Sequence, residues 1–161
     1  MDHNNFHTIM LCIFAITIYG TYIKLYAGEK SPSNKIIFYL FWAGYVFGYS
    51  YLTFLNRKAG SHNFIFNPLK PITDDLKNGK FPYEPVLNLL LFVPFGMTLP
   101  IIKEDACTYK KAAAIGGAIS LITEIMQIIS GLGEFEASDI VSNTLGTVAG
   151  LALYFHFLSR K

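Results

Sequence analysis

Two groups of polar residues fall at helical spacing inside strongly apolar stretches, and their types could support ligand binding or acid–base chemistry. One group is Ser120, Thr123, Glu124 and Gln127, and the other is Asp139, Asn143 and Thr147. Residues three or four apart share one face of an α-helix, so each group predicts a polar stripe along a helix. Polar side chains are costly inside a membrane, which makes these stripes the first candidates for a site.

The two carboxylates allow two interpretations that the residues alone leave open. Glu124 could act as a general acid or base, with Asp139 ionised beside water, because carboxylates in unlike environments commonly divide these roles. Alternatively, the polar side chains satisfy one another across helices, which contributes about 0.6 to 2 kcal/mol per bond. In that case Asp139 serves as the N-cap of the last helix, where it accepts backbone N–H bonds.

The composition indicates where these stripes must lie. Of 161 residues, 52% are hydrophobic and 15% are charged, against about 25% charged in an average soluble domain. This deficit excludes a disordered chain and a basic nucleic-acid-binding face, and a net charge of +2 suggests no strong electrostatic partner. We therefore predict an all-α, polytopic membrane helix bundle forming a single domain, and no nucleic-acid partner.

The charges cluster between five long apolar runs, each long enough to cross a hydrocarbon core of about 30 Å. The predicted transmembrane helices are approximately residues 8–26, 36–56, 85–102, 111–130 and 139–158. Residues 1–7 contain no Lys or Arg, so the first run is predicted to be a retained helix and not a cleaved signal peptide. The long connection 57–84 is the only one with the length of a lid.

Basic residues predict the orientation. With the N-terminus outside, the inner loops carry eight Lys or Arg and the outer loops carry five, so the positive-inside rule favours N-out and C-in. This orientation brings five polar residues from three helices to the outer leaflet, beneath the outer loop 57–84. The candidate ligand-binding residues are Asn88, Glu124, Gln127, Asp139 and Asn143.

The remaining residues suggest no metal or cofactor. Cys12 is predicted in mid-span and Cys107 in an inner loop, so a disulfide is not expected. The four histidines, His3, His7, His62 and His156, have no metal-ligand spacing. No nucleophile motif or glycine-rich phosphate loop is evident.

Four segments in order resemble the VanZ-like family. They are Phe66–Ile72 (FNPLKPI), Asn88–Gly96 (NLLLFVPFG), Ser120–Gln127 (SLITEIMQ) and Asp139–Gly146 (DIVSNTLG) followed by Gly150. The resemblance covers about residues 64–153. The individual residues that match are Asn88, Pro94, Gly96, Glu124, Gln127, Asp139, Asn143 and Gly146.

The resemblance implies a multi-pass protein of the bacterial cytoplasmic membrane, in a family named for a member that confers low-level teicoplanin resistance. Many members have an Arg shortly before the acidic pair ahead of the last helix, whereas residues 131–139 here contain no basic residue and Ser138 precedes Asp139. If the family binds an anionic group through that Arg, this chain has no basic residue at the corresponding place to bind it.

Two functions follow as hypotheses. The first is a non-catalytic protein that binds membrane lipid, a lipoglycopeptide or a lipid-linked cell-wall precursor at an outer-leaflet polar site. The second is a membrane-embedded enzyme that modifies an envelope lipid or glycan, with Glu124 and Asp139 as the acid–base pair.

Overall fold

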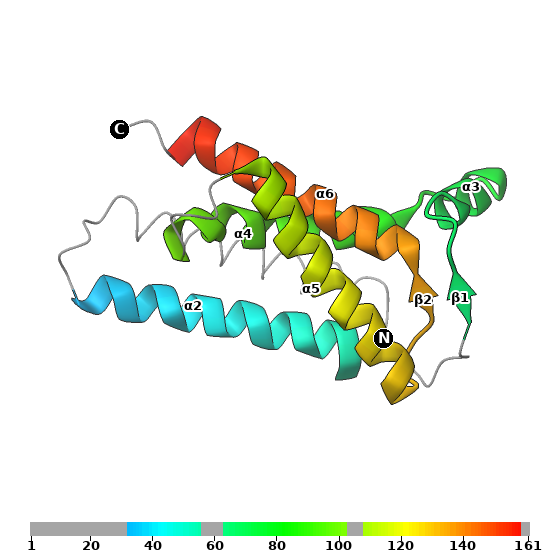
Figure 1. Ribbon diagram of the computed structural model, residues 1–161, viewed down its shortest axis with the longest axis horizontal. Helices are drawn as coiled ribbons and strands as arrows, with labels where there is room; N and C mark the ends of the chain where they lie inside the picture. The colour runs from blue at the N-terminus through cyan, green and yellow to red at the C-terminus, as the bar shows by residue number, and fades with distance from the viewer. Residues whose placement is uncertain (1–31, 56–62, 103–107, 159–161) are drawn as a thin grey trace.

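The computed structural model describes residues 32–55, 63–102 and 108–158, and this part of the chain is mostly helical (Figure 1). Its long helices are α2 (Pro32–Ser50), α4 (Tyr83–Ile102), α5 (Tyr109–Ser130) and α6 (Ala137–Leu153). Helices α2 and α6 continue as the π-helical turns η1 (Tyr51–Leu55) and η3 (Tyr154–Leu158). The short elements are strand β1 (Phe64–Ile65), helix α3 (Lys70–Lys77) and strand β2 (Phe135–Glu136).

The predicted helices other than the first coincide with these long elements. The first predicted helix, residues 8–26, lies outside the described residues, as do Cys12 and Cys107. The observed helices begin before the predicted spans; α5, for example, starts at Tyr109 and includes Lys110 and Lys111. The predicted spans were bounded by uncharged runs, which mark only the part of a helix that can lie in hydrocarbon. The first turn of a helix also accommodates polar side chains, so the helices begin earlier.

Two helices within the described residues are long and apolar enough to cross a membrane by length and composition. They are α4, with 20 residues, and α5, with 22. At 1.5 Å rise per residue, each measures about 30 Å, the thickness of a bilayer core.

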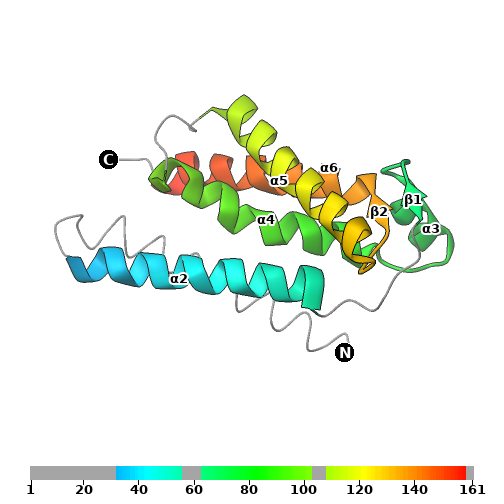
Figure 2. The same cartoon turned by 60° about the horizontal axis from the view of Figure 1, so that its bottom comes forward.

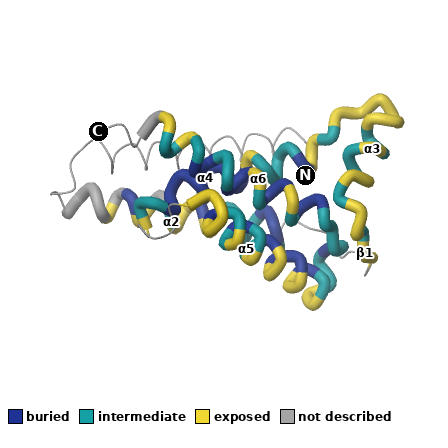
Figure 3. Tube along the Cα trace, turned by 45° about the horizontal axis from the view of Figure 1, so that its top comes forward, coloured by how far each residue is buried: buried dark blue, intermediate teal, exposed yellow. Residues whose placement is uncertain are grey.

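The bundle has an apolar core around α4, but the two faces of α5 are buried in the opposite sense to those of a helix in a water-soluble domain. The outward face of α5 exposes five large apolar side chains: Leu121, Ile122, Ile125, Met126 and Ile129. Its inward face buries Ser120, Thr123, Glu124 and Gln127. Figure 3 shows the burial along each helix, with the largely buried α4 running through the middle of the bundle. Apolar exterior and polar interior are expected where the surroundings are lipid.

Helix α4 packs against α2 and α6 in different ways (Figure 2). Against α2 the contact is aromatic: Trp42 stacks on Phe95 with ring centroids 6.0 Å apart, and the Tyr45 hydroxyl donates to the Leu91 carbonyl at 3.0 Å. Against α6 the helices touch through glycines. A methyl group at Gly146 would overlap the Leu89 carbonyl oxygen, so a close approach of this kind requires small residues.

The connection between α2 and α4 contains more structure than the sequence predicted. Strand β1 pairs in parallel with β2, with Phe64 opposite Phe135, and α3 follows β1. The Asn63 side chain also donates to Glu134 at 3.0 Å. These elements lie at one end of the bundle, together with the end of α5 and the start of α6 (Figure 1). We refer to residues 63–82 as the surface segment.

Candidate functional site

The polar face of α5 lies between α2 and α6 and forms hydrogen bonds to both. Toward α6, Asn143 Nδ2 donates to Ser120 Oγ at 2.8 Å. Toward α2, the Tyr49 hydroxyl and Thr123 Oγ1 share a hydrogen bond of 2.7 Å. One turn further along, Gln127 Nε2 donates to the carbonyl oxygen of Thr53 in η1 at 3.1 Å. The stripe predicted from the spacing therefore holds three segments together.

Glu124 links α5 to the start of α6. Its Oε2 accepts a hydrogen bond of 2.8 Å from the backbone N–H of Glu136, and the side chain is only 2% exposed. Glu136 is the N-cap residue of α6, and its own side chain makes no capping bond. Because the first N–H groups of a helix have no partner within it, a carboxylate from another helix serves here as the acceptor.

The prediction that Asp139 is an N-cap is wrong. Helix α6 begins at Ala137, so Asp139 is the third residue of its first turn and is buried. The Phe135–Glu136 pairing with β1 sets the chain direction before the helix, which moves its start two residues earlier than the apolar run suggested. Asp139 still lies at the positive end of the helix dipole, which favours a carboxylate.

Within the part of the chain that the structure describes, two buried amide oxygens have no hydrogen-bond partner. They are Gln127 Oε1 and Asn143 Oδ1, on side chains that are 1% and 6% exposed. Their amide nitrogens are both engaged, with Thr53 and Ser120 respectively. Buried polar atoms are nearly always paired, so each exception calls for an explanation such as a bound water, ion or ligand. These oxygens could accept hydrogen bonds from such a group.

Four of the five predicted site residues come together in this cluster, which we call the polar cluster: Glu124, Gln127, Asp139 and Asn143. The fifth, Asn88, lies on α4 and is half-buried. Within the described residues no hydrogen bond joins Asn88 to the other four. Its neighbour Leu89 instead presents a backbone carbonyl to Gly146 of α6.

The sequence interpretation missed Tyr49 and Thr53. Tyr49 bonds to Thr123 and also interacts electrostatically with Glu124 and Asp139. Tyr45, Tyr49 and Thr53 recur every four residues, which would have predicted a polar stripe on this helix too. The signal is weak because aromatic residues at the end of an apolar run suit an interfacial belt equally well.

The polar cluster is suited to hydrogen bonding more than to metal binding. Within residues 32–55, 63–102 and 108–158, no group of three or more His, Cys, Asp or Glu side chains could hold a metal ion. The cluster offers two carboxylates and two amide oxygens that have no partner among the described residues. It can therefore accept hydrogen bonds, or take part in proton transfer through Glu124 and Asp139.

Fold and site together define a helical bundle with two membrane-length helices around a buried polar cluster. The chain belongs to the VanZ/LLP1 family, whose sequence profile matches residues 6–159. Protein VanZ from Enterococcus faecium is 36% identical over 72 residues, which is 44% of this chain and 44% of that protein. The match thus spans less than half of the curated relative. No solved structure matches this chain.

Proposed function

We propose that this protein contributes to glycopeptide resistance by binding a membrane-anchored envelope ligand at the polar cluster. The ligand would be a lipoglycopeptide such as teicoplanin or the lipid-linked cell-wall precursor that it targets. Membership of the VanZ/LLP1 family and the similarity to Protein VanZ support the link to resistance. The similarity covers only 44% of Protein VanZ. The activity proposed for this chain is therefore argued from the residues of its own polar cluster.

The observation that carries the proposal is that two buried amide oxygens, on the same helices as the two buried carboxylates, have no partner among the described residues. Gln127 Oε1 and Asn143 Oδ1 need hydrogen-bond donors, and glycopeptides and lipid-linked precursors carry hydroxyl and amide N–H groups. An acyl chain in the surrounding lipid would add about 0.8 kcal/mol per buried methylene. Binding would then combine apolar anchoring with polar selection by the cluster.

The proposal includes a placement in the membrane. We infer five transmembrane helices in the bacterial cytoplasmic membrane, with N-out and C-in, so that the polar cluster faces the outer leaflet. The apolar outward faces of α5 and α6 support this placement; Ile129 is 74% exposed and Leu145 is 54% exposed. A reporter fused after Lys161 should read as cytoplasmic, and an extracytoplasmic signal would reject the inferred orientation.

Resistance variants test the binding site directly. Glu124→Gln and Asn143→Ala should reduce the protein's effect on teicoplanin susceptibility when membrane levels are matched. Thr144→Ala is the control, because Thr144 is next to Asn143 but bonds only within its own helix, to the Ile140 carbonyl at 2.7 Å. If both cluster variants retain the full effect of the unmodified protein, the polar cluster is not the site.

A second candidate function is a membrane-embedded enzyme acting on an envelope lipid or glycan. It is favoured by one observation: Glu124 and Asp139 are both near enough to Tyr49 to act on it electrostatically, so three groups capable of proton transfer lie in one region of the bundle. Purified protein in lipid nanodiscs distinguishes the two functions. Saturable binding of the precursor without turnover supports binding alone, whereas turnover that Glu124→Gln abolishes supports the enzyme.

A further inference from the structure

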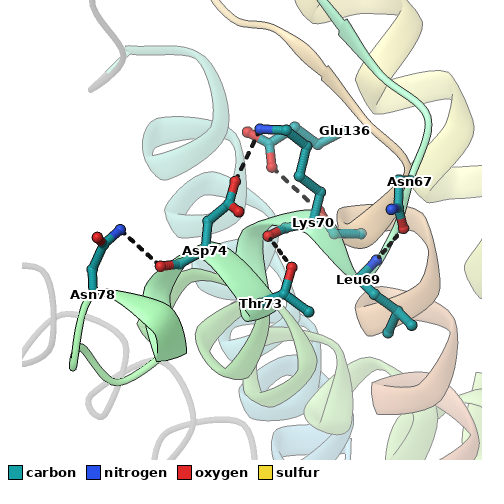
Figure 4. A network of polar contacts seen from close by, with 8 residues as sticks. Asn67, Leu69, Lys70, Thr73, Asp74, Asn78 and Glu136 are labelled. Carbon is teal, nitrogen blue, oxygen red and sulfur yellow. Dashed lines mark hydrogen bonds and ion pairs between the residues drawn. The ribbon is translucent and has the colours of Figure 1, made fainter.

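Helix α3 and its N-cap residue Leu69 leave two leucines exposed, next to an ion pair that is about half exposed. Leu69 and Leu76 are both 61% exposed and lie two helical turns apart, on one face. On another face Lys70 and Asp74 form an ion pair of 3.0 Å. Figure 4 shows this pair beside Glu136 of β2, with the Leu69 side chain directed away from it. A surface helix in water turns its apolar residues toward the protein core, so two exposed leucines on one face point to apolar surroundings.

The aromatic rings of β1 extend the apolar surface of α3. Phe64 in β1 and Phe66, which directly follows β1, are 54% and 71% exposed. Their rings stack with centroids 5.9 Å apart, and Phe66 also lies 5.7 Å from Phe135 of β2. Because β2 leads directly into α6, this aromatic cluster has a fixed position relative to the bundle.

The apolar surface is continuous with the beginning of a membrane-length helix. Only residues 78–82 separate α3 from α4, and exposed Phe81 and Tyr83 lie at this junction with ring centroids 4.8 Å apart. Aromatic side chains at the end of a membrane span belong at the boundary between headgroups and acyl chains. The same boundary is therefore within reach of α3 and β1.

From this continuity we propose that the surface segment is an interfacial membrane anchor. Helix α3 and the rings of β1 lie in the boundary between headgroups and acyl chains of the leaflet in which α4 begins. An amphipathic helix typically buries its apolar face about 5–10 Å into this boundary. The inference rests on the membrane placement proposed above but not on the ligand.

The charges of the surface segment indicate which lipids it contacts. Lys70 is already paired with Asp74, and the carboxylates of Asp75 and Glu84 accompany Lys77 and Lys80. Residues 63–82 thus carry three Lys against two Asp, a net charge of +1 that Glu84 just beyond the segment offsets, so the segment has no polybasic cluster that would attract anionic lipid. Apolar insertion into zwitterionic phosphatidylcholine is sufficient, and anionic lipid should not strengthen it.

Nitroxide labels on the full chain test the anchor. In a background with Cys12→Ser and Cys107→Ser, single cysteines replace Phe66, Leu76 or Lys77, and the protein is reconstituted in phosphatidylcholine vesicles. Labels at 66 and 76 should collide several-fold more with oxygen, which partitions into lipid, than with a water-soluble nickel complex. The label at 77, on the polar side of the same helix, is the matched control and should favour nickel.

Two results overturn the anchor. Labels at 66 and 76 that favour nickel as strongly as 77 would place the segment in water, and labels shielded from both reagents would place it against protein. A label at Ile122, which is exposed on α5, reports separately whether the bundle lies in the membrane. If oxygen reaches the label at 122 but not the labels at 66 and 76, the membrane placement holds and only the anchor is rejected. A gain in oxygen access at 66 and 76 on adding phosphatidylglycerol would contradict the inferred lipid independence.

Phe66→Trp provides a second measurement, in a Trp42→Phe background that removes the native tryptophan. Its fluorescence should be quenched more by lipid brominated near the headgroup than by lipid brominated near the chain end. Equal absence of quenching by both lipids would again reject insertion.

Discussion

Substituting Gly150 by alanine should weaken the contact between α4 and α6. An added Cβ would overlap the Val93 carbonyl oxygen and lie 2.9 Å from the Met97 backbone nitrogen. Both atoms belong to the backbone of α4, so no side-chain rotation can relieve the contact and the two helices must separate. Overpacking of this kind costs about 1–3 kcal/mol, and the higher helix propensity of alanine returns about 0.5–1 kcal/mol.

The expected result is a net loss of about 1–2 kcal/mol in the free energy of unfolding, which raises the unfolded fraction roughly tenfold. Unfolding by denaturing detergent in mixed micelles, followed by far-ultraviolet circular dichroism, measures it. Gly44→Ala is the matched control: it lies within α2, and nothing is within 4 Å of its added Cβ, so it should gain about 0.5–1 kcal/mol from helix propensity alone. Equal stability of the two variants would refute the close-packing argument.

Three further substitutions test the polar contacts and the end of α5 with the same unfolding assay. Tyr49→Phe removes the 2.7 Å bond to Thr123 and should cost about 0.5–1.5 kcal/mol; a neutral result would mean that the bond contributes nothing. Glu124→Leu leaves the Glu136 N–H without its acceptor and should cost about 1–3 kcal/mol, whereas Glu124→Gln retains an acceptor oxygen and should lose less. The reverse order would show that charge, and not the hydrogen bond, stabilises the start of α6. Gly131→Ala should cost about 1 kcal/mol because the residue has φ of 67° at the end of α5, and an unchanged midpoint would contradict this.

The spacing of polar residues was sufficient to predict the polar face of α5, because residues three or four apart lie on the same side of a helix. Ser120, Glu124 and Gln127 recur every three or four residues in an otherwise apolar run, and the structure buries all of them. The partners of these residues were not predictable in the same way. Gln127 bonds to a backbone carbonyl of η1 that is 74 residues away in sequence, and no local pattern specifies which helix comes to lie beside another.

The connection between α2 and α4 shows the same limit more strongly. Its strand β1 has only two residues, and its partner β2 lies beyond both α4 and α5 in the chain. Two residues are too few to show an alternating pattern. The pairing exists because α5 and α6 bring Phe135 to the end of the bundle, where the surface segment can reach it.

The order of residues along the chain is enough to predict the long helices, their apolar outer faces and the carboxylates among them. The reason is that both signals are local: the length of an apolar run and the spacing of polar residues by three or four can be read from neighbouring positions. Only the packed structure shows that Glu124 accepts the N–H of Glu136 and that Asp139 lies within the first turn of α6 instead of capping it. It also shows that two amide oxygens have no partner among the described residues. Hydrogen bonds depend on distances of a few tenths of an ångström between atoms on different helices. Those distances are set by the packing of the helices, in which Gly146 and Gly150 of α6 lie against α4 and Gly116 of α5 lies against Thr147 of α6.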